Sequence, residues 1–278
     1  MVSQTTGVDR YAVVGNPVAH SLSPQIHRAF AEQSGETIDY SAIELTLGDF
    51  ELRIRELLEQ GMKGANVTVP FKRQAWEICD HRSPRADDAG AVNTLIFGED
   101  GDISGDNTDG VGLTRDLLNN HHALIRHRKI LILGAGGAVR GVLAPLLGLN
   151  PEGLTIANRT LEKAEILAEE FRNSGNISVS SFSQLGQDKF DLIINATAAS
   201  LDNDVPPIPE EVLGVNSICY DFMYNIHSPT AFVSWAERYG ASQAFDGLGM
   251  LVEQAAESFF IWRGVRVDTA EVIANLRQ

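Results

Sequence analysis

Cysteine, positive charge and long apolar runs are all scarce in this chain, and each scarcity excludes a class of protein. The 278 residues include two cysteines, Cys79 and Cys219, which lack metal-ligand spacing and are expected to be buried thiols in a reducing cytosol. No run of 18 apolar residues occurs, and the start, MVSQTTGVDR, lacks the basic and apolar regions of a signal peptide. We therefore expect a cytoplasmic protein without a membrane span or a metal site.

Basic residues are outnumbered, with 22 Lys and Arg against 37 Asp and Glu, so the formal net charge is −15. This charge argues against binding to nucleic acid and to anionic membranes, and an anionic ligand must find a local positive pocket. The hydrophobic content of 44% is ordinary for a globular protein with two modest domains or one large one. The sequence leaves the oligomeric state open between a monomer and a homodimer.

What the chain does contain is a glycine-rich turn inside a strand–helix–strand pattern, residues 128–163. The apolar run 130–133 is followed by a helical pattern through Leu149, and a second apolar run covers 154–157. Glycine accepts positive φ and has no Cβ to block a pyrophosphate, and a helix N-terminus favours an anion. The pattern therefore predicts a dinucleotide site, with a plain strand–helix turn as the alternative because Val139 replaces the third glycine of the usual fingerprint. The glycines of this turn are Gly134, Gly136 and Gly137.

The end of the second strand of this unit carries cations where NAD-binding units usually carry Asp or Glu. Arg159 follows the strand directly, and Lys163 comes one helical turn later. A carboxylate would repel a 2′-phosphate, whereas a guanidinium attracts it and hydrogen-bonds it as a fork. We therefore predict NADP as the cofactor; the alternative is a solvated Arg and Lys at a helix start.

Strand-like and helix-like segments alternate along the whole chain. In the first half the expected strands are 11–14, 40–45, 65–69 and 92–97, and the expected helices are 24–33, 49–60 and 71–79. In the second half the further strands are 191–196, 217–222 and 242–245, and the helices are 109–118, 161–173, 230–239, 248–263 and 269–277. This alternation predicts an α/β fold with mostly parallel sheets and helices on both faces. The last two helices exceed what one doubly wound sheet needs, so we expect them to pack back onto the first half.

Polar side chains collect in four loops at the strand ends of the first half. Because ligands bind outside the carboxyl ends of strands in open α/β sheets, we expect these loops to form one site. Ser21 and Ser23 suit a carboxylate or a polyol, although Ser23 also fits a helix N-cap before Pro24. Further polar positions at these ends are Thr68, Lys72, Asn93 and Asp109; singly, Lys72 is typical of a solvated cation and Asp109 of a helix cap.

A lysine and an aspartate in one pocket suit the reduction of a ketone. Hydride arriving at carbon leaves negative charge on oxygen, and an acid must neutralise it. The ammonium of Lys72, held by Asp109, can donate that proton. The competing acids are histidines, of which His27 falls within a helix, where a structural role is expected; the others are His20 and His81.

Eight blocks of the sequence, taken together and in order, resemble the shikimate dehydrogenase family. They are GNPVAHSLSPQIH, KGANVTVPFK, AGAVNTL, GDNTDGVG, LGAGGAVRGV, ANRT, YDFMY and DGLGMLVEQAA, and they span nearly the whole chain. The resemblance implies NADPH-dependent reduction of 3-dehydroshikimate to shikimate in aromatic amino-acid (chorismate) biosynthesis. It also implies two α/β domains: a substrate domain, 1–109 with 248–278 returning to it, and a Rossmann-like NADP domain, 110–247.

The resemblance further implies roles for single residues. Lys72 matches the catalytic lysine and Asp109 its paired aspartate, and both contact the substrate. The remaining substrate positions are Ser21, Ser23, Thr68, Asn93, Tyr224 and Gln254. The cofactor positions are Gly134, Gly136, Gly137, Ala138, Asn158, Arg159, Thr160, Lys163, Thr197, Met223 and Gly247.

Two departures from the family pattern concern the cofactor. Lys163 stands where the family often has Arg, and Thr197 is followed by Ala-Ala-Ser in place of the common Ser-Ser-Gly. Two alternatives remain for the function. One is a quinate/shikimate dehydrogenase that uses NAD, against which Arg159 argues. The other is a non-catalytic NADP-binding regulator, against which the presence of Lys72 and Asp109 argues.

Overall fold

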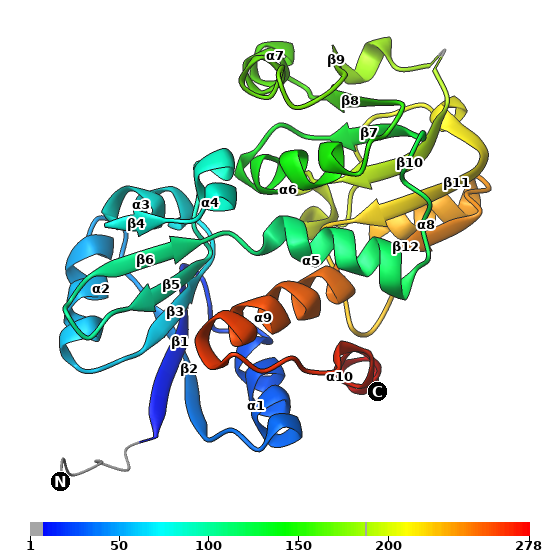
Figure 1. The fold of residues 1–278 in the computed structure, drawn as a ribbon. Helices are drawn as coiled ribbons and strands as arrows, with labels where there is room; N and C mark the ends of the chain where they lie inside the picture. Colours follow the sequence, from blue (N-terminus) through cyan, green and yellow to red (C-terminus); the bar gives the residue numbers. More distant parts are fainter. Residues whose placement is uncertain (1–7, 187) are drawn as a thin grey trace, which may run out of the picture. The chain divides into compact units, whose positions relative to one another are not determined.

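The computed structural model describes residues 8–186 and 188–278, and the chain divides into two compact units (Figure 1). Unit 1 comprises Met1–Thr108, described from residue 8, and Gln254–Val272; unit 2 comprises Asp109–Glu253 and Ile273–Gln278. Each unit has its own six-stranded sheet, and the expected α/β fold with mostly parallel sheets is confirmed. Helix α9 (Leu248–Arg263) begins in unit 2 and ends in unit 1, and the last residues, Ile273–Gln278, belong to unit 2.

The sheet of unit 1 has the strand order β2-β1-β3-β5-β6-β4. All of its strands except β5 run in one direction. Strand β2 lies on one side of β1 and β3 on the other, so the chain order reverses at β1, and ligands bind at such a switch point. The strands are β1 (Asp9–Gly15), β2 (Ile38–Glu44), β3 (Gly64–Val67), β4 (His81–Arg82), β5 (Thr94–Phe97) and β6 (Ile103–Asp106).

Helices cover both faces of this sheet because alternate side chains of β1 point to opposite sides. Ala12 and Val14 pack in the apolar cluster under α2, α3 and α4. Tyr11 and Val13 pack on the other face, where Tyr11 stacks on Trp262 of α9 with ring centroids 4.6 Å apart. The helices of unit 1 are α1 (Ser23–Ser34), α2 (Phe50–Glu59), α3 (Lys72–Ile78) and α4 (Pro84–Ala89). The sequence did not predict β4 or α4, which are too short to show a periodicity.

The sheet of unit 2 is entirely parallel, with the order β12-β11-β10-β7-β8-β9. Counted from β9, this is the order 3-2-1-4-5-6 of doubly wound dinucleotide-binding sheets. The order reverses between β7 and β10, so the loops after these two strands line the expected crevice. The strands are β7 (Lys129–Leu133), β8 (Gly153–Ala157), β9 (Ile177–Ser180), β10 (Phe190–Asn195), β11 (Leu213–Asp221) and β12 (Gln243–Phe245).

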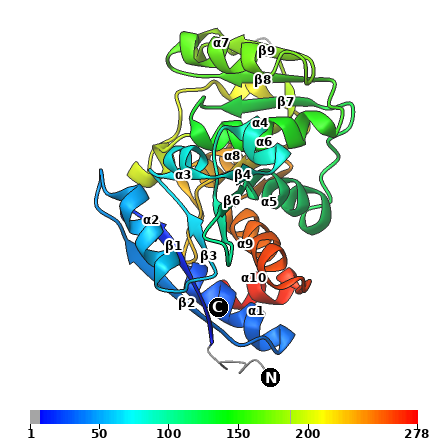
Figure 2. The same cartoon turned by 60° about the vertical axis from the view of Figure 1, so that its left-hand side comes forward.

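Strand β7 lies beside β8 in the sheet of unit 2 (Figure 2). Its apolar run, 130–133, is buried on both faces, as a continuous apolar run predicts for a central parallel strand. Ile130 and Ile132 pack in the cluster under α5, α6 and α7, while Leu131 and Leu133 pack in the cluster that contains Phe232 of α8. Each such buried side chain stabilises the fold by roughly 1.5–3 kcal/mol. The helices of unit 2 are α5 (Asp109–Arg115), α6 (Gly137–Gly148), α7 (Leu161–Glu170) and α8 (Ala231–Arg238), with a π-helical turn at Asp116–Asn120 after α5. Helix α10 (Thr269–Leu276) begins in unit 1 and ends in unit 2.

Two searches of the described ranges give negative results. None of their helices is long and apolar enough to cross a membrane. They also hold no group of three or more His, Cys, Asp and Glu side chains able to hold a metal ion. Both cysteines are buried, and burial raises the pKa of the Cys79 and Cys219 thiols to about 12, so neither is poised to react as a thiolate.

Candidate active site

Ser21 and Ser23 lie where β1 leads into α1, at the switch point of unit 1. The alternative role of Ser23, a helix N-cap, is not found: the helix begins at Ser23 itself, Leu22 takes the cap position, and no side chain caps it. Instead, the backbone N–H of Ser23 donates to Ser21 Oγ at 3.2 Å. Ser23 is therefore a buried hydroxyl, 6% exposed, without a capping function, while Ser21 has the local structural role.

The loops after β1 and β3 are held together at this edge of the sheet. Asn16 N donates to Val69 O at 3.0 Å, and a Cβ on Gly15 would collide with the Thr68 methyl group. Lys72 is the first residue of α3, and its carbonyl accepts a hydrogen bond from Val92 N at 2.9 Å. The structure thus brings Thr68 and Lys72 of the β3 loop beside the serine loop and the segment that carries Asn93.

Asn93 and Gln254, both predicted for the substrate, meet in a buried polar network of unit 1. Asn93 is 2% exposed, and its Oδ1 accepts from Thr108 N at 2.9 Å. Its Nδ2 donates to Thr108 Oγ1 at 2.9 Å and to Gln254 Oε1 at 3.2 Å. The second segment of unit 1, which begins at Gln254, therefore adds a polar side chain to the switch point formed by the first.

Tyr40 and Asn66 also belong to this network, and sequence reasoning did not single them out. The Tyr40 phenol donates to Asn66 Oδ1 at 2.7 Å. Burial raises the pKa of Tyr40 well above its usual value, and a hydrogen bond with Ser23 opposes that shift. The available signal was Asn66 itself, an amide at a buried position of strand β3, where a partner is required.

The loop that leads to Asp109 is anchored by an arginine. Arg85 donates to Asp106 through Nε at 2.6 Å and Nη2 at 2.8 Å, a bidentate pair, and Nη2 also lies 3.2 Å from Glu257 Oε1. Ser83 Oγ donates to the same Asp106 carboxylate at 2.6 Å. Asp109, three residues further on, is 7% exposed and begins α5 of unit 2. The Arg85–Asp106 pair therefore holds the end of β6, three residues before Asp109, the predicted catalytic aspartate.

In unit 2 the glycine turn lies at the reversal of strand order. Gly134 has φ +109°, and a Cβ there would lie 3.2 Å from the Ala196 carbonyl, so the position requires glycine. A Cβ on Gly136 or Gly137 would meet no atom within 4 Å. Helix α6 begins at Gly137, with Ala138 in its first turn, so the N–H groups of its N-terminus lie at this turn. The turn therefore has the room and the polarity that a pyrophosphate needs.

The end of β8 carries the predicted 2′-phosphate residues. Asn158 Nδ2 donates to Thr160 O at 2.8 Å and closes the turn before α7. Arg159 and Lys163 are exposed, and within the described part of the chain neither forms an ion pair. Two uncompensated cations beside one helix start suit a phosphate dianion.

A buried carboxylate organises the loops after β10 and β11. Asp221 accepts hydrogen bonds from Ser200 Oγ at 2.6 Å, Thr230 Oγ1 at 2.7 Å and Met223 N at 3.1 Å. Burial raises the pKa of Asp221, and these hydrogen bonds oppose that shift. Thr197 is held in the adjoining loop, since its hydroxyl donates to Asn195 Oδ1 at 2.7 Å. The predicted cofactor residues Met223 and Thr197 are thus held in place by hydrogen bonds to Asp221 and Asn195, which sequence reasoning did not single out.

Tyr224 and Gly247 belong to two segments that are joined in unit 2. Gly247 N donates to Met223 O at 3.0 Å, and a Cβ on Gly247 would collide with the Phe222 carbonyl, so only glycine fits. Asp246 accepts from Arg277 Nη1 at 2.9 Å, which fastens the end of the chain to this junction. The structure therefore brings Met223, Tyr224 and Gly247 together.

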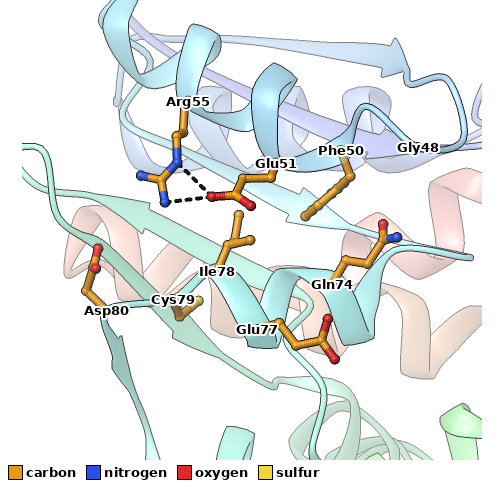
Figure 3. A pocket seen from close by; sticks show the side chains of 9 residues that line it. All are labelled: Gly48, Phe50, Glu51, Arg55, Gln74, Glu77, Ile78, Cys79 and Asp80. Atoms are coloured by element: carbon orange, nitrogen blue, oxygen red, sulfur yellow. Dashed lines mark hydrogen bonds and ion pairs between the residues drawn. The ribbon is translucent and has the colours of Figure 1, made fainter.

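A separate cavity of about 480 Å³ lies between α2 and α3 of unit 1 (Figure 3). Its charged groups are largely paired: Arg55 donates to Glu51 Oε1 at 3.0 and 2.9 Å, and Glu77 accepts from Arg73 Nε at 3.0 Å. None of the predicted substrate or cofactor residues lines this cavity. Its lining residues are Gly48, Phe50, Glu51, Arg55, Gln74, Glu77, Ile78, Cys79 and Asp80.

An all-parallel sheet in the order 3-2-1-4-5-6, with an open glycine turn and a cationic strand end, defines a dinucleotide-binding α/β protein. Three family models match the chain: "Shikimate dehydrogenase substrate binding domain" at residues 13–95, "Shikimate / quinate 5-dehydrogenase" at 116–202, and "Shikimate 5'-dehydrogenase C-terminal domain" at 247–277. The chain belongs to the shikimate dehydrogenase family, which confirms the resemblance found in the sequence.

Individual relatives match over nearly the full length. Proteins of Alkalilimnicola ehrlichii and Hahella chejuensis, both named shikimate dehydrogenase (NADP(+)), are 54% and 53% identical; the matches cover 97% and 98% of this chain and 98% and 99% of theirs. The crystal structure of an Ael1 enzyme from Pseudomonas putida has a TM-score of 0.92 at 46% identity, covering 97% of this chain and 98% of that one. Shikimate 5-dehydrogenase of Thermus thermophilus, in complex with NADP(H) and shikimate, has a TM-score of 0.86 at 33% identity, covering 97% and 99%.

Proposed function

We propose that the chain catalyses the reduction of 3-dehydroshikimate to shikimate with NADPH, as a step of aromatic amino-acid biosynthesis. The observation that carries this proposal is the full-length similarity, 54% and 53%, to proteins named shikimate dehydrogenase (NADP(+)). The exposed cations at the end of β8 support NADP over NAD, because a guanidinium stabilises a 2′-phosphate that a carboxylate would repel. The finer expectations, a cytoplasmic location and a monomer or homodimer, remain part of the proposal.

Unit 2 fits the cofactor. The open space beside Gly136 and Gly137 accommodates a pyrophosphate, and Arg159 with Lys163 would hold the 2′-phosphate. Bound NADPH supplies the hydride. Met223 and Gly247 would line the nicotinamide end, where the Asp221 and Asn195 side chains hold the two loops in place. The remaining proposed cofactor contacts are Gly134, Ala138, Asn158, Thr160 and Thr197.

Unit 1 supplies most of the proposed substrate contacts. Ser21 and Ser23 would bind the substrate carboxylate, since hydroxyl donors satisfy a carboxylate without adding charge. Thr68, Asn93 and Gln254 would bind the ring hydroxyls, and Tyr224 of unit 2 would complete the set. The buried network around Asn93 supports this assignment, because a site that orients a polyol needs polar groups whose own orientation is fixed.

Lys72 and Asp109 are the proposed catalytic pair. The Lys72 ammonium would lie against the substrate ketone, stabilise the charge that develops on oxygen as hydride arrives, and donate the proton to it. The Asp109 carboxylate would keep the lysine charged and in place. Reduction then converts the ketone into the hydroxyl of shikimate.

One assay separates this function from its alternatives. NADPH and NADH oxidation are followed with 3-dehydroshikimate and with 3-dehydroquinate as substrates. The proposal expects turnover of 3-dehydroshikimate with NADPH at a much higher kcat/KM than any other pair. Comparable use of 3-dehydroquinate with NADH would identify a quinate/shikimate dehydrogenase, and cofactor binding without turnover would identify a regulator.

A further inference from the structure

Ser258 has no role in any of the sequence motifs, yet it lies at the centre of the buried network in unit 1. It is 0% exposed and sits on α9 one helical turn after Gln254. Its Oγ is 2.7 Å from Thr94 Oγ1 and 2.9 Å from Asn66 Nδ2. Because no part of Ser258 is exposed, any effect on a substrate must act through its neighbours.

One backbone group determines how the amides of this network are oriented. Thr108 N can only donate, and it lies 2.9 Å from Asn93 Oδ1, so this end of the Asn93 amide is the carbonyl oxygen. The other end is therefore the NH2 group, which donates to Gln254 Oε1 at 3.2 Å. The Gln254 amide consequently turns its carbonyl toward Asn93 and its NH2 group to the other side.

The donor and acceptor roles of the hydroxyl groups can then be assigned in the same way. Thr94 Oγ1 donates to Asn93 Oδ1 at 2.9 Å, and a hydroxyl has only one hydrogen to give. In the 2.7 Å bond between Ser258 and Thr94, Ser258 is therefore the donor, and this bond is shorter than its 3.1 Å contact with Gln254 O. Ser258 Oγ in turn accepts from Asn66 Nδ2. The result is one directional chain of hydrogen bonds that runs through Tyr40, Asn66, Ser258, Thr94, Asn93 and Gln254.

We propose that Ser258 is a positioning residue of the substrate site: its hydroxyl donates to Thr94 and so reinforces the orientation that the Thr108 N–H sets for the Asn93 amide and, through it, for that of Gln254. With its carbonyl held by Asn93, Gln254 directs its NH2 group at a hydroxyl oxygen of the substrate. Chains of this kind polarise one another, so each link strengthens the next. The inference rests on the proposed function, which places Asn93 and Gln254 at the substrate.

Ser258→Ala removes the central link. Asn66 Nδ2 then loses its 2.9 Å acceptor and Thr94 Oγ1 loses its 2.7 Å donor, so the Asn93 amide keeps its bond from the Thr108 N–H but loses the support that the chain gives to it and to Gln254. We expect KM for 3-dehydroshikimate to rise about three- to tenfold, the range that the loss of one buried hydrogen bond supports. The kcat and the KM for NADPH should stay within about twofold of the parent, because Ser258 contacts neither reacting group nor cofactor.

The experiment compares steady-state kinetics of the parent with Ser258→Ala, Thr94→Val, Gln254→Ala and the double variant Ser258→Ala/Gln254→Ala. Thr94→Val breaks the neighbouring link with little change in volume, so it tests the chain even where Ser258→Ala folds poorly. Ser34→Ala is the control: it removes a serine hydroxyl from helix α1 of the same unit, where Ser34 Oγ donates to Phe30 O at 2.7 Å and lies 3.3 Å from Ala31 O, neither of them a member of the network. Thermal unfolding of each variant checks folding.

The energetic coupling between the Ser258 and Gln254 substitutions separates a positioning role of Ser258 from a merely structural one. If Ser258 acts through Gln254, its substitution raises KM in the parent but has little effect in the Gln254→Ala background. An equal rise in both backgrounds, an unchanged KM in Ser258→Ala, or a fall in kcat with KM unchanged would each overturn the inference. Absence of 3-dehydroshikimate turnover in the parent would overturn the proposed function and this inference with it.

Discussion

The Asn195 side chain donates a hydrogen bond from Nδ2 to Asp221 Oδ1 over 3.0 Å, where β10 and β11 end beside each other. Both side chains are fully buried. Together they hold the loops that carry Thr197 and Met223, two proposed cofactor contacts. A polar pair at the strand ends therefore shapes the nicotinamide end of the proposed site although neither residue was among the predicted cofactor contacts.

We predict that Asp221→Asn weakens NADPH binding by about tenfold or more, since a neutral amide replaces one acceptor oxygen and each lost bond to a charged group is worth about 1.5–3 kcal/mol. Fluorescence titration with NADPH measures the Kd, and thermal unfolding measures stability. Ser217→Ala, in the middle of the same strand, removes a buried hydroxyl that donates to Phe190 O at 2.9 Å and should leave the NADPH Kd unchanged. Parent-like NADPH affinity in Asp221→Asn would show that this pair only stabilises the fold.

Arg159→Asp should reverse the preference for the cofactor. The substitution removes a charge-assisted bond to the 2′-phosphate and adds a repulsion, so we expect the ratio of kcat/KM for NADPH over NADH to fall by about 10²-fold or more. Arg172→Asp makes the same change of charge at the exposed end of α7, where Arg172 pairs with Glu169, and should leave the ratio as in the parent. Equal use of both cofactors by the parent would contradict the proposed clamp.

Lys72→Ala should lower kcat by at least about 10², the typical contribution of a general acid, with NADPH affinity and folding unchanged. The measurement is single-turnover hydride transfer at saturating 3-dehydroshikimate. Asp109→Asn should also lose rate, and the double variant should be much less than additive because the two groups act as a unit. Arg73→Ala removes the neighbouring cation of α3, which pairs with Glu77 on the surface, and should keep the parent rate. Hydride transfer at the parent rate in Lys72→Ala would exclude the mechanism.

His27 makes the stability of unit 1 sensitive to acid. It is 0% exposed, stacks on Tyr40 at 4.1 Å, and neither ring nitrogen has a hydrogen-bond partner among the described residues. Burial lowers its pKa to about 3, against about 6.5 in the unfolded chain. Between these two pKa values His27 is protonated in the unfolded chain and neutral in the folded one. The free energy of unfolding therefore falls as the pH drops below about 6.5, by up to ~1.4 kcal/mol per pH unit.

His27→Phe removes this titration and two unpaired buried nitrogens. We predict that the variant is at least as stable as the parent at pH 7.5 and loses less stability on acidification to pH 5, by roughly 2 kcal/mol. Chemical unfolding at the two pH values measures the difference. His81→Phe, at an exposed histidine that contacts Asp102 at 3.3 Å, serves as the control and should follow the parent. If the free energy of unfolding falls by the same amount on acidification in the parent and in His27→Phe, His27 is not the source of the acid sensitivity.

Local steric and periodic constraints let the sequence alone predict most of the framework. Helix α9 was expected at the limits it has, the glycine turn lies where Gly134 requires positive φ, and the strand ends carry the expected polar residues. These features depend on a backbone angle, a face of a helix or an alternation along a strand, and each of these is determined by a few neighbouring residues. The edge strands β4 and β9 are too short or too polar to show such a pattern.

The sequence by itself determined the family, the dinucleotide turn and the residues proposed for catalysis, because each is encoded in a short motif. Only the tertiary structure decided which polar groups hold those residues in place. Asn66 and Ser258 are 192 positions apart, and Asn195 and Asp221 are 26 apart, yet each pair shares a buried hydrogen bond. Such partners are selected by packing: once the backbone brings them out of water, each buried donor must find an acceptor, and which one it finds depends on the whole fold.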